Sequence, residues 1–167
     1  MAIIAANIVT YLSGGAANAN VNASLGGAKS SVAWAGGTLH DLFDVISGDE
    51  NAASDVEYRC IYVQNNHGTL TWEAVKLWVS AETAGGAAIG IALAGEGVSA
   101  VAETVANENT APVGESFTAP TSKATGLTIG NLAAAAYYGI WIRRSASNSA
   151  ALDADGGTLS WSGDTAA

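Results

Sequence analysis

The chain has 167 residues, of which 49% are hydrophobic and 13% are charged, and its formal net charge is -9. Its 6 Lys and Arg residues form no basic stripe. We therefore expect neither a nucleic acid nor an anionic membrane as a partner, since both are bound through clustered cations. An average globular protein has about 25% charged residues. A surface this poor in charge favours partners that cover part of it.

One domain is expected over residues 1–167, because a chain of this length can bury roughly 70% of its unfolded surface. Cys60 is the single cysteine, so it cannot form an internal disulfide, and its place in an alternating strand predicts a small core hydrophobe. The apolar run at 3–12 has no basic residue before it, which argues against a secretory signal. No apolar run reaches the length of about 18 residues that predicts a membrane span.

The first predicted strand covers residues 3–12, IIAANIVTYL. Residues 16–37 that follow are small and polar, with Trp34 as the one large side chain. A segment with so little side-chain area is ordered mainly by what it lies against. We therefore predict an extended N-terminal arm over 16–37 that could lie on an adjacent subunit.

One short amphipathic helix is predicted near residue 40. Thr38 and Asp41 match a helix N-cap signature, and apolar residues follow at helical spacing before Ser47 and Gly48 end the run. These apolar residues are Leu39, Leu42, Phe43 and Ile46. The acidic residues 48–55 are expected to form a loop.

Residues 56–79 predict two long β-strands joined as a hairpin. Polar and apolar residues alternate on both sides of the sequence Asn-Asn-His-Gly at 65–68, and these residue types tolerate turn conformations. The alternation of the second strand slips by one residue after Ala74. A β-bulge near Ala74, or a strand buried on both faces, would explain the slip.

Further strands are predicted at 87–95, 126–132, 134–145 and 158–163, whereas residues 97–110 are ambiguous. Seven or so short strands with turn signals between them are typical of a sandwich or a jelly-roll. The predicted fold class is therefore all-β, an antiparallel β-sandwich or jelly-roll-like barrel with one short helix and an extended N-terminal arm.

No catalytic residue, cofactor or metal site is predicted. His40 and Asp44 would share one helix face, but two residues do not make a site, and a solvated polar face is the favoured explanation. Two histidines and one cysteine leave too few ligands for a zinc site. Two oxygen-rich sequences resemble parts of calcium loops, but both patterns are incomplete and turn chemistry accounts for them. They comprise Asp153, Asp155 and Gly156, and Asp49, Glu50 and Asp55.

Aromatic residues supply the interface candidates. Five tryptophans could form a carbohydrate platform, but those in alternating strands are expected in a core. Trp78 shares a strand face with Lys76, and Tyr138 follows Tyr137, so the two tyrosines point to opposite faces. We predict Trp34, Trp78 and Tyr138 as interface residues.

The sequence SGDENAASDVEYRCIYVQN at 47–65, with DLFDVI at 41–46 before it, resembles small virion structural proteins of tailed bacteriophages. The sequences YYGIWIRRS at 137–145 and GTLSWSGDT at 157–165 are similar in character to the ends of such proteins. The matched residues shape strands and turns and include no catalytic motif. The resemblance implies a β-sandwich subunit repeated over a particle, as a capsid decoration or cement protein or a tail or neck component.

The expected function is therefore that of a non-enzymatic virion protein, a capsid decoration subunit that forms homo-oligomers and contacts other virion proteins such as the major capsid protein. An acidic subunit is repelled by packaged DNA, which favours the outer surface of the capsid. The alternatives are a tail or fibre component that binds host glycans through exposed aromatics, and a small hydrolase with a carboxylate pair.

Overall fold

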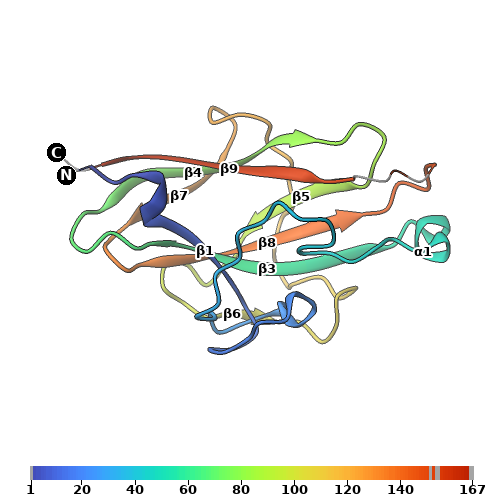
Figure 1. Ribbon diagram of the computed structural model, residues 1–167, viewed down its shortest axis with the longest axis horizontal. Helices are drawn as coiled ribbons and strands as arrows, with labels where there is room; N and C mark the ends of the chain where they lie inside the picture. Colours follow the sequence, from blue (N-terminus) through green and yellow to red (C-terminus); the bar gives the residue numbers. More distant parts are fainter. Residues whose placement is uncertain (1, 151, 153–154, 166–167) are drawn as a thin grey trace.

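The computed structural model describes residues 2–150, 152 and 155–165, and its elements are labelled in Figure 1. One α-helix, α1 (Gly48–Ala53), and two single-turn helices, η1 (Ala5–Asn7) and η2 (Val21–Ala23), occur in this part of the chain. The strands are β1 (Ile8–Leu12), β2 (Gly26–Gly27), β3 (Val56–Asn65), β4 (Trp72–Glu82), β5 (Ala88–Leu93), β6 (Ala102–Thr104), β7 (Leu127–Leu132), β8 (Tyr137–Ser145) and β9 (Gly157–Thr165).

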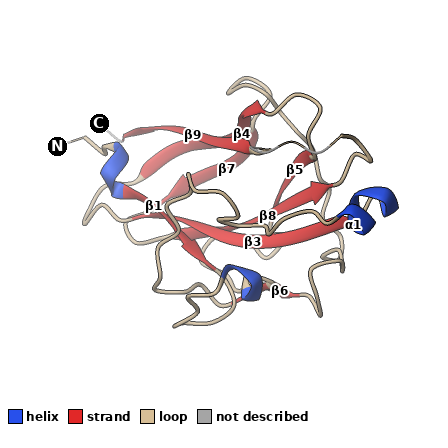
Figure 2. Ribbon diagram, turned by 45° about the vertical axis from the view of Figure 1, so that its right-hand side comes forward, coloured by secondary structure: helices blue, strands red, loops and turns tan. Residues whose placement is uncertain are grey.

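The strands form three antiparallel sheets. The main sheet has the order β1-β3-β8-β5, the second has the order β7-β4-β9, and β2 pairs with β6. Figure 2 shows the main sheet between the second sheet on one side and β6 with its loops on the other. The predicted all-β, antiparallel class with one short helix is confirmed, and the architecture is that of a sandwich with an added layer.

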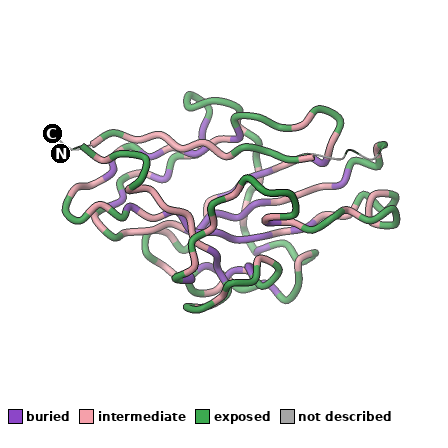
Figure 3. The backbone as a smooth tube through the Cα atoms, in the orientation of Figure 1, coloured by how far each residue is buried: buried purple, intermediate pink, exposed green. Residues whose placement is uncertain are grey.

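The main sheet is buried on both faces. Ile61 and Val63 of β3 belong to an apolar cluster shared with the second sheet. Cys60 and Tyr62 belong to a second cluster on the other face, together with residues of the β6 layer, by which we mean β2, β6 and the loops beside them. Figure 3 shows this burial along β3 and β8. Cys60 is 0% exposed, which confirms it as a core residue. A strand covered on both faces explains why the sequence around residue 60 is apolar at consecutive positions.

The predicted hairpin is wrong in its pairing, although both strands exist. β3 pairs with β1 and β8, and β4 pairs with β7 and β9, so residues 66–71 carry the chain from one sheet to the other. The side-chain amide of Asn65 donates to the carbonyls of Leu70 and Leu132 at 2.8 and 2.9 Å. The same alternation of polar and apolar residues occurs in a hairpin and in two strands that belong to different sheets. Which of the two forms depends on pairing with strands far away in the sequence.

The bulge in β4 is confirmed at Ala74. Ala74 has a φ of 50° and is exposed, and the register with β7 shifts between Trp72 and Val75. The extra residue brings Trp72 onto the same buried face as Val75 and Leu77.

The helix predicted over residues 38–46 is wrong, because that segment consists of turns and bends. His40 has a φ of 59°, and the carbonyl of Asp44 accepts a hydrogen bond from Arg144 instead of a helical N–H. The helix begins at Gly48, inside the expected acidic loop. There Ser47 and Glu50 form a capping box, with the Ser47 N–H donating to the Glu50 carboxylate at 2.6 Å.

The extended arm over 16–37 is not confirmed, because this segment folds against its own domain. The Ser24 carbonyl accepts a hydrogen bond from the N–H of Cys60, and the Tyr62 hydroxyl donates to the Gly27 carbonyl. Burial raises the pKa of Tyr62 to about 12. The segment also pairs with β1, since the Trp34 N–H donates to the Thr10 carbonyl at 2.8 Å. It is therefore part of the layer that covers the main sheet.

The remaining predicted strands are found at the expected places. β1, β5, β7, β8 and β9 each overlap a predicted strand, and the ambiguous residues 97–110 contain β6. No helix in the described part of the chain combines the length and hydropathy needed to cross a membrane.

Candidate functional site

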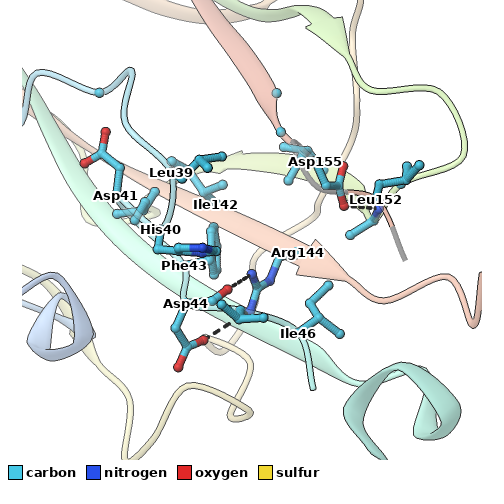
Figure 4. A pocket seen from close by; sticks show the side chains of 18 of the residues that line it. Leu39, His40, Asp41, Phe43, Asp44, Ile46, Ile142, Arg144, Leu152 and Asp155 are labelled. Carbon is cyan, nitrogen blue, oxygen red and sulfur yellow. Dashed lines mark hydrogen bonds and ion pairs between the residues drawn. The ribbon is translucent and has the colours of Figure 1, made fainter. Parts of the chain in front are cut away.

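A cavity of about 820 Å³ lies between β9 and residues 34–48, and we call it the β9 cavity. Its floor is made by the main sheet, with Ile89 of β5 and Ile142 and Arg144 of β8. One wall is β9, with Leu159 and Trp161. The other is the loop at residues 38–46, where the sequence predicted a helix. Figure 4 shows Phe43 and Asp44 of that loop beside Arg144, and Leu39 beside Ile142.

Arg144 attaches this loop to the sheet. Its guanidinium donates to the backbone carbonyl of Asp44 and lies 3.4 Å from the Asp44 carboxylate. Its Nε donates to Oε2 of Glu57 at 2.6 Å, and its charge lies 4.9 Å from the Phe43 ring centre. Arg144 thus connects β8, β3 and the loop, and it leaves a charged group at one end of the cavity floor.

Glu57 is buried beside Arg144, with only 4% of its surface exposed. Burial raises the pKa of its carboxyl, and the Arg144 charge and hydrogen bond oppose the shift without cancelling it. An ion pair removed from water in this way needs both partners, because either charge alone is poorly solvated. The Glu57–Arg144 pair therefore serves to position the cavity wall.

Arg59 is a second buried arginine that contacts Phe43, and it forms its ion pair with Glu108, in the loop after β6. It is 0% exposed, its Nη2 lies 2.5 Å from Oε2 of Glu108, and its guanidinium lies 5.5 Å from the Phe43 ring. Phe43 thus contacts two guanidinium groups, Arg59 and Arg144. The sequence analysis missed these residues. The sequence does contain a signal for them. Glu57 and Arg59 lie at alternate positions before Ile61 and Val63, and therefore on the same buried face of the strand.

His40 and Asp44 do not share a helix face. His40 lies in a left-handed turn, while Asp44 is engaged by Arg144. The neighbouring Asp41 accepts a hydrogen bond from the Trp34 indole at 2.6 Å. All three residues line the cavity, and the hydrogen bonds of Asp41 and Asp44 hold the loop in place.

The three predicted interface residues lie in different surroundings. Trp34 and Tyr138 are partly buried and pack against the core cluster between the two larger sheets. Trp78 follows Leu77 in β4, pairs with Ser160 of β9, and points away from the buried face that holds Leu77 and Val79. Trp34 lines the β9 cavity, and Trp78 and Tyr138 do not. Their role as interface residues stays a prediction.

The acidic sequences considered for calcium have structural partners. Glu50 caps α1, and its pKa is lowered by the hydrogen bond from the Ser47 backbone. Asp55 accepts hydrogen bonds from the Val56 N–H and the Asn109 amide at 2.9 and 2.8 Å. Among the described residues, no three His, Cys, Asp or Glu side chains are placed to hold a metal ion.

The second acidic sequence is only partly described. Asp155 accepts a hydrogen bond from the Ala87 N–H at 2.6 Å, whereas Asp153 lies outside the described residues.

Comparison with known proteins identifies no family. No protein-family model, no curated protein and no solved structure matches the chain. The function is therefore argued from the surface and the β9 cavity.

Proposed function

We propose that this chain is a non-enzymatic structural subunit of a virion, a capsid decoration or cement protein that stabilises the particle through contacts with its neighbours. The observation that carries the proposal is the position of its large exposed apolar side chains. Among the described residues there are seven, of which six form two groups, and Ile4 (62% exposed), near the N-terminus, belongs to neither. Leu39, Val45 and Leu152 are 62%, 63% and 43% exposed, and Val98, Val101 and Val113 are 47%, 55% and 81% exposed.

The two groups lie on opposite sides of the main sheet. The first group borders the β9 cavity, on the side of the second sheet. The second surrounds β6, where the N–H of Val113 donates to the Glu103 carboxylate at 2.7 Å. Exposed apolar patches rimmed by polar residues mark interaction sites. A subunit with such patches on opposite sides can contact two different neighbours, as a repeated array requires.

The composition supports the same proposal. Only 13% of the residues are charged, so much of the surface has no charged group to desolvate at a contact, while the net charge of -9 disfavours contact with packaged DNA. The partners would be further copies of the chain and other virion proteins such as the major capsid protein, on the outer surface of the capsid.

The proposal is tested by binding purified chain to particles that lack it. The wild type should saturate the particles at a fixed copy number, as measured by quantitative mass spectrometry after sedimentation. Leu39→Asp and Val113→Asp should each weaken binding, because each places a charge in one apolar group. Thr121→Asp, at an exposed position outside both groups, is the matched control. Equal binding of all four proteins, or no binding of the wild type, would contradict the proposal.

A second candidate is a tail or fibre component that binds host glycans. It is favoured by the outward position of Trp78 on β4, because indole rings stack on sugars. Glycan-array binding that disappears in Trp78→Ala but persists in Leu39→Asp would support this candidate over capsid decoration.

A further inference from the structure

The two larger sheets differ in how their edges are covered. In the main sheet, the backbone of residues 32–34 bonds to β1, and Thr118 exchanges two backbone hydrogen bonds with Ile91 of β5. In the second sheet, β9 pairs with β4 alone. Within the described residues, no backbone hydrogen bond joins the other edge of β9 to a strand. β7 also ends the sheet, but it has 6 residues and a bulge at Gly130, whereas β9 has 9 residues.

The free edge of β9 borders the β9 cavity. The second sheet has three strands over a main sheet of four, and residues 34–48 cover the part of the main sheet that a fourth strand would cover. This loop contributes Leu42 and Phe43 to the core, but it supplies no strand to β9. The cavity is thus positioned where the next strand of the second sheet would lie.

The volume of the cavity agrees with a short strand. Strands lie about 4.8 Å apart within a sheet and stacked sheets lie about 10 Å apart, so one strand occupies a cross-section of roughly 48 Å². At that cross-section a cavity of about 820 Å³ extends for about 17 Å, which is the length of about five extended residues.

We propose that the β9 cavity accepts an extended segment of another protein, which pairs with the free edge of β9 as a fourth strand of the second sheet. Main-chain hydrogen bonds to β9 would give affinity, as in other cases of strand addition. Alternate side chains of the segment would face Ile89, Ile142 and Leu159, so they are apolar.

The charged residues that line the cavity indicate which charge the bound segment should carry. Among the described residues, Asp41, Asp44 and Asp155 line the cavity together with one guanidinium, that of Arg144, which is already paired with Glu57. The cavity therefore has an excess of negative charge and favours a segment with Lys or Arg beside its apolar residues. A second copy fits less well, because the chain carries 15 acids and 6 bases. This inference does not depend on the virion proposal.

The test uses the full chain and three fluorescein-labelled peptides of seven residues. The first alternates valine and threonine and has a lysine at each end, the second has glutamates in place of the lysines, and the third is the lysine peptide with N-methylated valines. In fluorescence anisotropy at low salt, the lysine peptide should bind at least tenfold more tightly than either of the others. Hydrogen exchange should slow in 157–165 when the lysine peptide is added.

Two variants separate the cavity from other surfaces. Leu39→Arg places a cation at the cavity wall and should weaken binding of the lysine peptide at least tenfold, whereas Val113→Arg, beside β6, should leave it unchanged. Tryptophan fluorescence reports that both variants are folded. The inference is overturned if the lysine peptide does not bind at 1 mM, if Leu39→Arg binds as the wild type does, or if the exchange of β9 is unaffected. It is equally overturned if the chain dimerises through β9 without any peptide.

Discussion

At the scale of single residues, Asn65 determines how the chain passes from one sheet to the other. It is 0% exposed at the end of β3, and its amide nitrogen donates to the buried carbonyl of Leu132 and the partly buried carbonyl of Leu70, while its oxygen accepts from the His67 N–H at 3.0 Å. The sequence places Asn65 in a hairpin turn, but its side chain satisfies groups from two segments, the connection 66–71 and the end of β7. Leaving a buried polar group unpaired costs about 1–3 kcal/mol.

Replacing this amide should therefore destabilise the fold. Asn65→Ala is expected to lower the free energy of unfolding by about 3 kcal/mol, because two carbonyls lose their donor. Urea denaturation followed by tryptophan fluorescence measures the change. The control is Gln64→Ala, whose amide donates to the Ala135 carbonyl at the exposed surface, and it should cost less than about 1 kcal/mol. Equal losses in the two variants would contradict this role of Asn65.

Glu57 should give the stability a characteristic pH dependence. Because burial raises its pKa, the folded chain holds this proton to a higher pH than the unfolded chain does. The unfolding free energy of the wild type relative to Glu57→Gln should therefore fall as the pH rises above the ordinary glutamate pKa. Urea denaturation at a series of pH values measures the difference.

The matched control is Glu50→Gln, where the opposite sign is expected. The pKa of Glu50 is lowered, so its contribution is present above the ordinary glutamate pKa and is lost as the pH falls through that range. A Glu57 contribution that grows with pH would mean that the attraction of Arg144 outweighs burial.

At the scale of elements, the bulge in β4 keeps one face of the strand buried from Trp72 to Val79. Ala74 adopts a left-handed conformation there, which costs an L-residue with a β-carbon about 1–2 kcal/mol. Its N–H is satisfied by the Asn131 side chain at 3.0 Å. The bulge thus carries local strain, which is offset by the burial of Trp72 and Val75.

A glycine at the bulge should relieve this strain. Ala74→Gly is expected to raise the free energy of unfolding by about 0.5 kcal/mol, because the gain in conformational fit exceeds the entropy that glycine loses on folding. The control is Ala81→Gly, at an exposed position of the same strand without positive φ. There the glycine relieves no strain and only adds the conformational entropy lost on folding, so the free energy of unfolding should fall by about 0.5–1 kcal/mol. Thermal unfolding by calorimetry compares the two, and a fall in both would contradict a strained bulge.

At the scale of the whole molecule, two layers enclose the main sheet, one on each face. Cys60 lies in this sheet and faces the β6 layer, and burial raises the pKa of its thiol. Both effects make the thiol unreactive in the folded state. Opening of the layers, rather than local fluctuation of a loop, is required to expose it.

Labelling of Cys60 should therefore report the opening of the whole core. With a disulfide reagent in native buffer, the wild type should react at the rate of core opening, and in urea the labelled fraction should follow the fluorescence transition. The control is Val113→Cys combined with Cys60→Ala, which should react at once because position 113 is 81% exposed. Fast native labelling of Cys60 would contradict the three-layer burial.

The sequence by itself predicted the longer strands and the burial of Cys60, and it offered the bulge as one of two explanations for the slip in β4, because alternation and residue size are local properties. It did not determine the partner of each strand. The pairing of β3 with β1 and β8, and of β4 with β7 and β9, depends on residues far apart in the chain. A hairpin and a crossing between sheets have the same local pattern, so only the tertiary structure distinguishes them.

The β9 cavity was likewise decided by tertiary contacts. The apolar spacing at 39–46 fits a helix, but Leu42 and Phe43 pack on the main sheet and Arg144 takes the Asp44 carbonyl, so the segment becomes the cavity wall. Intrinsic helix preference is worth only a few tenths of a kcal/mol per residue. Burial of one large apolar side chain is worth about 1.5–3 kcal/mol, which is why the packing of the segment prevailed over its local pattern.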